Sequence, residues 1–319
     1  MKFLTRIDTA DWLLERDRFA ILTHRKPDGD TIGSAAGLCR GLRQLGKTAY
    51  VLHNPEVTER LAPLLEGITK ESAEEGDVIV AVDVAADHML PKVFDYLRNS
   101  VDLRIDHHGS GTDFAPNSMV DGESASCAEL IWDILMEMGV ESEAEVAEPI
   151  YVGTATDTGC FRFANTTAHT FDTAGDCAAA GVDIYTWNQL LFETNSLERL
   201  RLQGWVAEHT KLFSDGKLAI CALPKAVEEE IGVDEDDMGN LSSFIRTIEG
   251  VRLAALLRET DSEDVTKMSL RAVPGWDAAA VCAKFGGGGH TGAAGGVIKL
   301  PLEKAAQALE QAMLEWENS

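Results

Sequence analysis

The sequence has no Cys-x-x-Cys pair, and its six cysteines stand far apart, at positions 39, 127, 160, 177, 221 and 282. This spacing argues against zinc ribbons and disulfide frameworks and is typical of reduced structural thiols. No run approaches the roughly 20 continuous apolar residues of a membrane span. The N-terminal segment lacks the apolar core of a signal peptide because it is interrupted by Asp8, Asp11, Glu15 and Asp17. We therefore expect a cytoplasmic protein without membrane contact.

Basic residues are also scarce. Lys and Arg number 28 against 53 Asp and Glu, which gives a net charge of −25 with histidine neutral. Such a chain repels a long polyanion at a distance unless metal ions or local basic residues reverse the field. The charge balance predicts small substrates and argues against long duplex nucleic acid as a partner.

The length of 319 residues exceeds that of one typical domain, and 45% hydrophobic and 25% charged residues are ordinary globular values. In the first 190 residues, short β-rich runs alternate with helical patterns. We expect strands at 19–23, 48–53, 77–84 and 101–106 and a helix at 31–46. This alternation predicts an α/β domain with a mainly parallel sheet and helices on both faces, whose ligand site lies outside the C-terminal ends of the strands.

A second α/β unit follows. Residues 195–213 are typical of a helix that joins two domains, and after Lys217 the alternation resumes in a smaller unit with a C-terminal helix. The acidic segment 233–240 is expected to be a solvated loop or helix start. We predict a catalytic domain at 1–190, a linker helix at 191–213 and a smaller substrate-binding α/β domain at 214–319.

The first expected strand runs directly into HRKPDGD, which places His24, Asp28 and Asp30 on one loop, with Gly29 allowing a tight backbone. These side chains are of the metal-binding kind. Asp and Gly are also ordinary residues of a strand-to-helix turn, and Thr31 could cap the helix. Taken alone, the motif supports both interpretations equally.

Three more segments carry ionisable residues at the ends of apolar runs. Asp83 closes VIVAVDV, where a buried carboxylate is costly unless it is paired or binds a metal. Asp106, His107 and His108 follow the next strand, and adjacent histidines cannot point the same way if strand geometry continues. One can then bind metal while the other faces the substrate. Asp157 ends the helical run YVGTATDTG and by itself would be an ordinary helix stop.

All four segments are expected at the C-terminal edge of one sheet, and chance is a poor explanation for this convergence. Carboxylate and imidazole ligands without cysteine suit Mn²⁺ or a similar ion better than structural zinc. Two such ions about 3.5–4 Å apart would hold a hydroxide for in-line attack on phosphorus.

The segments HRKPDGD, AVD, DHHG and TDTG resemble, in order and spacing, the four motifs of the DHH phosphoesterase superfamily. KFGGGGHTGAAGG, residues 284–296, resembles the signature of the DHH-associated C-terminal domain. Within the superfamily the chain is most similar to the nanoRNase-type oligoribonucleases that also dephosphorylate 3′-phosphoadenosine 5′-phosphate (pAp).

The resemblance implies a role for each matching residue. One ion would be held by His24, Asp28 and Asp83, and the other by Asp30, Asp83, His107 and Asp157. Asp83 then bridges the ions and is catalytic, as is His108, which is left near the scissile phosphate. Asp106 would fix the orientation of the histidines through hydrogen bonds without binding an ion itself.

Substrate contacts are also implied. Arg271 in SLRAV and His290 match positions expected to grip a terminal phosphate, and arginine suits this task through bidentate donation. The nucleotide pocket would be shaped by Gly286, Gly287, Gly288 and Gly289. Arg162 in CFRF is a secondary candidate for phosphate binding, with simple solvation as an equal alternative.

The leading hypothesis is a Mn²⁺-dependent enzyme, with Mg²⁺ or Co²⁺ as substitutes, that hydrolyses pAp and very short single-stranded oligonucleotides to mononucleotides. The alternative is a phosphodiesterase for linear or cyclic dinucleotides such as pApA. A long-substrate exonuclease and an inorganic pyrophosphatase are disfavoured by the domain content that the resemblance implies. A nucleotide sensor without turnover is the least favoured hypothesis, because no ligand is missing. Homodimerisation is expected from the resemblance alone.

Overall fold

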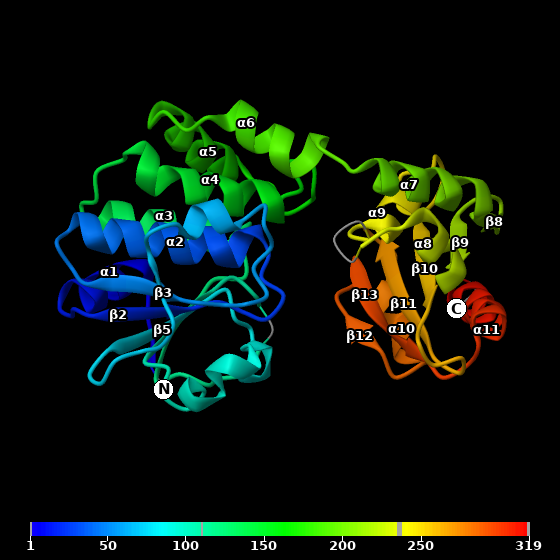
Figure 1. Cartoon of the computed structure of the whole chain (residues 1–319), viewed down its shortest axis with the longest axis horizontal. Coiled ribbons are helices and arrows are strands. Elements are labelled where there is room, and N and C mark those ends of the chain that lie inside the picture. Colours follow the sequence, from blue (N-terminus) through cyan, green and yellow to red (C-terminus); the bar gives the residue numbers. More distant parts are fainter. Residues whose placement is uncertain (1, 110, 235–237, 318–319) are drawn as a thin grey trace. The chain divides into compact units, whose positions relative to one another are not determined.

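The computed structural model describes residues 2–109, 111–234 and 238–317 (Figure 1). They belong to two compact units, residues 1–194 and residues 195–319. Part of the expected acidic loop, residues 235–237, lies outside the described residues. In the described part of the chain, no helix combines the length and apolar character needed to cross a membrane.

The N-terminal unit contains a seven-stranded sheet in which every pair of neighbours is parallel. Its strand order is β1-β7-β6-β5-β2-β3-β4. This confirms the predicted parallel α/β sheet. The four expected strands are present, and the short strands β1, β4 and β7 are additional. The bounds are β1 Lys2–Phe3, β2 Phe19–Leu22, β3 Ala49–Leu52, β4 Thr69–Lys70, β5 Val78–Val82, β6 Leu103–Asp106 and β7 Asn117–Val120.

Helices α1 to α4 contribute to the core on one face of this sheet. The other face is covered by the short 3₁₀ helices η2 and η3, where α-helices were expected. Pro91 explains part of the difference, because proline disfavours a helical residue before it, and Leu90 is extended at φ −64° and ψ 140°. The bounds are α1 Arg6–Leu14, α2 Gly29–Gln44, η1 Ala62–Leu65, η2 Asp87–Met89, η3 Lys92–Leu97, α3 Cys127–Glu137, α4 Ala144–Asp157, α5 Ala168–Ala179 and α6 Ile184–Asn188, followed by the π-helical turn η4 Gln189–Glu193.

The strand order reverses between β2 and β5. From β2 the chain continues to β3 on one side, whereas β5 continues to β6 and β7 on the other. Such a reversal opens a crevice at the carboxyl ends of the two central strands, and ligands of α/β proteins bind there. The segments with His24 and Asp83 follow these two strands, and Asp106 ends the neighbouring β6.

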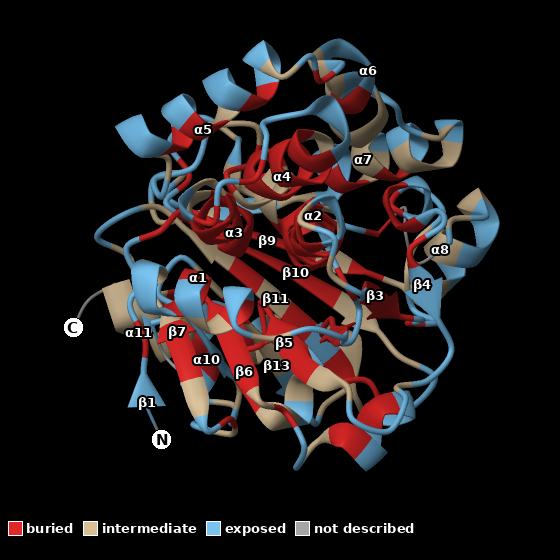
Figure 2. Ribbon diagram, turned by 90° about the vertical axis from the view of Figure 1, so that its left-hand side faces the viewer, coloured by how far each residue is buried: buried red, intermediate tan, exposed pale blue. Residues whose placement is uncertain are grey.

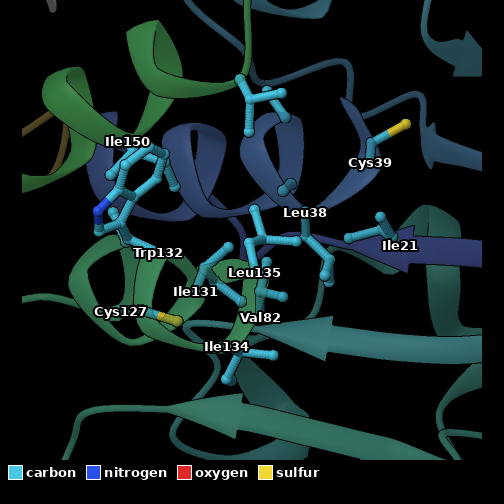
Figure 3. Packing of buried hydrophobic residues seen from close by; sticks show 14 of the residues in the cluster. Ile21, Leu38, Cys39, Val82, Cys127, Ile131, Trp132, Ile134, Leu135 and Ile150 are labelled. Carbon is cyan, nitrogen blue, oxygen red and sulfur yellow. The ribbon is translucent and has the colours of Figure 1, made fainter. Parts of the chain in front are cut away.

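Helix α2 is buried along nearly its whole length (Figure 2). In Figure 3, its Leu38 lies in the same apolar layer as Leu135 of α3 and Val82 of β5. On the side toward α4, glycine is required: a Cβ on Gly33 would lie 2.8 Å from the amide nitrogen of Gly153. Helix α2 begins at Gly29, earlier than the predicted Thr31, because Asp28 is the N-cap.

The C-terminal unit contains a six-stranded mixed sheet of order β12-β13-β11-β10-β9-β8, in which only β9 and β10 pair in parallel. This agrees with the predicted smaller α/β unit. The bounds are β8 Lys211–Phe213, β9 Leu218–Leu223, α8 Lys225–Ile231, α9 Leu241–Arg246, β10 Leu253–Glu259, β11 Thr266–Ala272, α10 Ala278–Ala283, β12 Gly288–Gly289, β13 Ala293–Ile298 and α11 Leu302–Glu317.

Helix α7, Leu197–His209, is shorter than the helix predicted over 195–213. Thr210 is extended, and the next three residues form β8 against β9. Leu202 and Val206 of α7 are buried in the core of the C-terminal unit, together with Ala219 and Ile245. The helix is thus part of this unit's core.

Candidate metal centre

The loop after β2 presents His24 and Asp28 together. His24 is buried, and its Nδ1 lies 2.8 Å from the carbonyl oxygen of Arg25. Because a carbonyl only accepts, Nδ1 carries the proton and Nε2 is left as a free ligand. That Nε2 lies 3.6 Å from Asp28 Oδ1 and 3.4 Å from Asp83 Oδ2.

Asp30 is fixed by the N-terminus of α3. Its two carboxylate oxygens accept from the backbone N–H groups of Cys127, at 2.7 Å, and Ala128, at 2.8 Å. The free amides and positive dipole end of a helix stabilise a carboxylate there. Burial nevertheless raises the pKa of Asp30, so a nearby cation would stabilise its ionised form. The Ser126-to-Glu129 spacing is typical of a helix start, but it does not indicate that Asp30 contacts this helix.

Asp83 is almost completely buried, and among the described residues its Oδ1 has no hydrogen-bond partner. The residue has a left-handed backbone, at φ +57°, which Asp tolerates better than most residues. Burial and the neighbouring charge of Asp30 raise the pKa of Asp83 well above its ordinary value. A buried carboxylate oxygen without a donor is what a metal ligand requires.

His107 faces three carboxylates. Its Nδ1 lies 3.2 Å from the carbonyl oxygen of Ser124 and therefore donates to it. Its Nε2 lies 3.7 Å from Asp30 Oδ2, 3.6 Å from Asp83 Oδ1 and 3.6 Å from Asp157 Oδ2. Burial lowers the pKa of His107, but the three carboxylates outweigh it and raise the pKa to about 9.

Asp157 is the last residue of α4, where the negative end of the helix dipole disfavours a carboxylate. Burial and the charge of Asp30 raise its pKa to about 8. A bound divalent cation would offset both the unfavourable helix dipole and the cost of burying this carboxylate beside Asp30.

The distances within this cluster are compatible with metal coordination. Separations of 3.4 to 3.7 Å between imidazole and carboxylate are too long for hydrogen bonds. Two ligands each about 2.1 Å from one ion are about 3.0–3.6 Å apart, depending on the angle between them. The side chains form three overlapping groups able to hold a cation, which are His24 with Asp28 and Asp83, Asp30 with His107 and Asp157, and Asp83 with His107 and His108. The donor set therefore fits a pair of divalent ions.

His108 differs from its neighbour in how it is held. Strand β6 ends at Asp106, so strand geometry does not separate the two rings, whose centroids are 4.6 Å apart. His108 Nδ1 lies 2.8 Å from Asp106 Oδ1 and 3.5 Å from Asp83 Oδ1. Since the bond to Asp106 occupies Nδ1, the nitrogen available for other chemistry is Nε2.

The predicted substrate residues lie in the C-terminal unit. Arg271 is on β11, and burial lowers the pKa of its guanidinium. With Ser242, Lys267 and Ser269, it lines a pocket of about 390 Å³. His290 is exposed, and its backbone N–H donates to the carbonyl of Ala293.

The glycine segment 286–289 needs its glycines at three of four positions. Gly286 and Gly289 have φ of +74° and +142°, and a Cβ on Gly287 would lie 2.5 Å from the carbonyl oxygen of Gly295. Gly288 has open space around it. The segment turns tightly before β12 pairs with β13.

Arg162 belongs to the N-terminal unit, as do the candidate metal ligands. It is exposed, and its Nε donates to the carbonyl of Gly159 at 2.6 Å. This local bond is a structural role that the sequence did not indicate.

Two family models match the chain. The DHH family, N-terminal domain, covers residues 18–154, and the DHHA1 domain covers residues 215–318. A Thermus thermophilus protein called bifunctional oligoribonuclease and PAP phosphatase NrnA is 35% identical over 299 residues, which are 92% of this chain and 89% of the relative. The chain belongs to the DHH family. Its resemblance to DHH phosphoesterases is thus confirmed, and it is a hydrolase of phosphate esters.

Two further similar proteins match nearly the whole chain. The crystal structure of an exopolyphosphatase-related protein from Bacteroides fragilis has a TM-score of 0.87 at 27% identity and covers 98% of this chain and 96% of that one. A Bacillus subtilis protein called cyclic-di-AMP phosphodiesterase GdpP is 24% identical over 95% of this chain but 48% of its own length.

Two asparagines that the sequence analysis did not identify support the segments of the candidate metal centre. Buried Asn54 donates to Thr23 Oγ1 at 3.0 Å and to the carbonyl of His24 at 2.9 Å. The side-chain amide of Asn165 donates to the carbonyls of Ala125, at 2.9 Å, and Asp157, at 3.2 Å. Asn54 joins the segment after β3 to the His24 segment, and Asn165 joins the Asp157 segment to the residues that precede α3. No short motif could have indicated these contacts. For Asn54, the available signal was a polar residue directly after an apolar strand.

Proposed function

We propose that this chain is a Mn²⁺-dependent phosphoesterase that hydrolyses pAp and very short oligonucleotides to mononucleotides. The observation that carries the proposal is Asp83: both its oxygens face imidazoles at 3.4–3.6 Å, and Oδ1 has no hydrogen-bond donor in the described part of the chain. The DHH relatives named oligoribonuclease and PAP phosphatase support the substrate class.

The proposed ligand assignment is the one that the family resemblance implies, and the side-chain groups at this site support it. His24, Asp28 and Asp83 would hold one ion, and Asp30, Asp83, His107 and Asp157 the other. When bound, the ion pair supplies an activated hydroxide and neutralises charge on the phosphate. The protein fixes the tautomers of His24 and His107 through backbone carbonyls, so that both Nε2 atoms stay free as ligands.

His108 and Asp106 would act on the substrate side. Asp106 accepts from His108 Nδ1 and so fixes the orientation of the ring. His108 Nε2 would then be the atom that contacts a phosphate oxygen or the leaving oxygen.

Substrate recognition would belong to the DHHA1 domain. Arg271 would bind a terminal phosphate with His290, while Gly286 to Gly289 shape the nucleotide pocket. A pocket of about 390 Å³ beside Arg271 is in the range for a small ligand. Arg162 stays a secondary candidate for phosphate contact. The net charge of −25 supports substrates of a few nucleotides, and a cytoplasmic homodimer remains a prediction.

A timed product assay tests the proposal. The purified chain with Mn²⁺ receives pAp, a five-nucleotide RNA, pApA and pyrophosphate in separate reactions, each with an EDTA control. We expect phosphate from pAp, stepwise shortening of the RNA, and no turnover in EDTA. Hydrolysis of none of the four substrates would refute the proposal and favour a nucleotide sensor.

A phosphodiesterase for linear or cyclic dinucleotides is the second candidate. The relative called cyclic-di-AMP phosphodiesterase, which aligns with 95% of this chain, favours it. The same metal centre would serve this reaction. Turnover confined to pApA or its cyclic precursor would establish this candidate in place of the first.

A further inference from the structure

Arg104 is a buried arginine on β6 for which neither the metal centre nor the substrate sites provide a role. Its side chain is 3% exposed, and it forms an ion pair with Asp106, whose side chain is 0% exposed. A buried ion pair contributes little to stability compared with apolar residues of similar size. Arg104 and Asp106 are two positions apart on one strand, so both side chains lie on the same face of the sheet.

The carboxylate of Asp106 connects this arginine to His108. One oxygen, Oδ2, receives the guanidinium Nη2 of Arg104. The other, Oδ1, receives His108 Nδ1 at 2.8 Å and the backbone N–H of His108 at 3.2 Å. The three side chains form one continuous line of hydrogen bonds, which ends at the ring expected to face the scissile phosphate.

The guanidinium of Arg104 also contacts residues 111–114, in the segment that follows the two histidines. Arg104 Nη1 donates to the carbonyl of Thr112 at 3.4 Å, and its Cζ lies 5.7 Å from the centre of the Phe114 ring. A Cβ on Gly111 would lie 2.8 Å from Arg104 Nη2. Thr112 in turn donates its N–H to the carbonyl of Ala85, two residues after Asp83. Arg104 thereby links the segments that leave β5 and β6.

We propose that Arg104 is a positioning residue that acts through Asp106 on His108. It orients Asp106 so that Oδ1 accepts from His108 Nδ1 and leaves Nε2 uncommitted, and in the described part of the chain it has no hydrogen bond with a candidate metal ligand. The inference rests on the proposed function for the chemistry of His108, but the arrangement itself belongs to the metal-free chain.

Kinetics of Arg104→Met, Asp106→Asn and the double variant test this proposal in the Mn²⁺-loaded protein. We expect each single change to lower kcat for pAp about 10- to 100-fold, with KM within about twofold and bound Mn²⁺ unchanged. The double variant should be no slower than the slower single variant, because both changes break one line of contacts. Losses that multiply, or an unchanged kcat in Arg104→Met, would overturn the proposal.

Arg40→Met is the matched control, since the Arg40 side chain is 10% exposed and also donates to two backbone carbonyls, those of Leu64 and Glu145. It should keep the kcat of the unmodified chain. If Arg104→Met does not fold, Arg104→Lys replaces it. Lysine keeps the charge but cannot reach Asp106 and Thr112 together, so kcat should fall partway. Full kcat in that variant would contradict the proposal.

A second readout does not need turnover. In the metal-free chain, the imidazole NMR spectrum should contain a slowly exchanging, low-field Nδ1–H signal of His108, assigned by its loss in His108→Gln. The signal should disappear in Asp106→Asn and move or broaden in Arg104→Lys, while Arg40→Met leaves it in place. An unchanged signal in both Arg104→Lys and Asp106→Asn would refute the arrangement. If the unmodified chain hydrolyses none of the substrates, the proposed function fails, and this signal still decides the role of Arg104.

Discussion

Four carboxylates and two imidazoles share a small, mostly buried volume at the carboxyl ends of β2, β5 and β6. Without cations, His24, His107 and Asp157 retain protons that they would lose more readily in water. Burial lowers the pKa of His24, but Asp28 and Asp83 outweigh it and raise the pKa to about 11. The pKa of His107 is about 9 and that of Asp157 about 8. The protonated groups substitute for the missing positive charge.

Binding of Mn²⁺ should therefore release protons. At pH 7 the three groups are mainly protonated in the metal-free chain, and each must lose its proton to become a ligand. We expect release of more than one proton per chain and an affinity that rises as the pH increases from 7 to 9. Calorimetric titration of the chain with Mn²⁺ in two buffers of different ionisation enthalpy measures the release. Identical heats in both buffers would contradict the assignment.

Asp83→Asn should separate activity from stability. Asn tolerates the left-handed backbone and fills the same space, but its amide cannot bridge two ions. We expect turnover to fall at least about 1,000-fold. The melting temperature of the metal-free variant should rise by about 2–4 °C per kcal/mol gained, because a buried carboxylate is replaced by a neutral group.

The matched control for this change is Asp172→Asn, at an exposed position of α5. It should alter neither turnover nor melting temperature, both measured on metal-free and Mn²⁺-loaded protein. If Asp83→Asn retained full activity, the bridging role would be excluded.

At the scale of elements, the packing of α2 against α4 positions the ligands. The N-terminus of α2 carries Asp28 and Asp30, and the C-terminus of α4 carries Asp157. A Cβ on Gly153 of α4 would lie 3.1 Å from Asp30 Oδ1, and a Cβ on Gly33 of α2 would lie 2.8 Å from the nitrogen of Gly153, so the two helices approach as closely as glycine allows. The spacing of the helices and that of the ligands are thus set together.

Gly33→Ala should disturb both the spacing of α2 and α4 and the spacing of the candidate ligands. Its Cβ would clash with the carbonyl of Pro149 and lie 2.8 Å from the nitrogen of Gly153, so the helices must separate. We expect a loss of about 1–3 kcal/mol in the free energy of unfolding, together with weaker Mn²⁺ binding. Gly175→Ala in α5 is the control, since its Cβ meets no atom within 4 Å. It should be neutral or stabilise by up to about 1 kcal/mol. Equal stability and Mn²⁺ affinity in the two variants, measured by denaturant unfolding and titration, would contradict this role for the glycines.

The elements that the sequence predicted are those with a strong pattern. Strands β2, β3, β5 and β6 are apolar runs that end at the expected edge, and α2 and α11 have helical periodicity. The two-residue strands β1 and β4 have too few residues for a pattern, and the 3₁₀ helices depend on Pro91 and its surroundings. The candidate ligands could be named from sequence. The contacts of Asp30 with α3, the left-handed backbone of Asp83 and the tautomers of the histidines depend on distant segments and could not.

At the scale of the whole molecule, the candidate metal ligands belong to the N-terminal unit, and the main proposed phosphate contacts, Arg271 and His290, belong to the C-terminal unit. The net charge of the chain is −25. The proposed metal ions and Arg271 would each supply local positive charge on this acidic chain.

Arg271→Ala should accordingly raise KM for pAp about 10- to 100-fold, because a charge-assisted bond is lost, and leave the Mn²⁺ content unchanged. Arg252→Ala, an exposed arginine of the same domain, should have the KM of the unmodified chain. Steady-state kinetics with metal analysis of both variants measures this. A loss of bound Mn²⁺ in Arg271→Ala would contradict the separation of roles.

The most direct test of the central claim is a Mn²⁺ titration followed by electron paramagnetic resonance and phosphate release from pAp in the same samples. We predict two Mn²⁺ per chain, a signal typical of two interacting ions about 3.5–4 Å apart, and hydrolysis that rises only as the second ion binds. Full hydrolysis with a single isolated Mn²⁺ per chain, or in the presence of EDTA, would contradict the two-metal account.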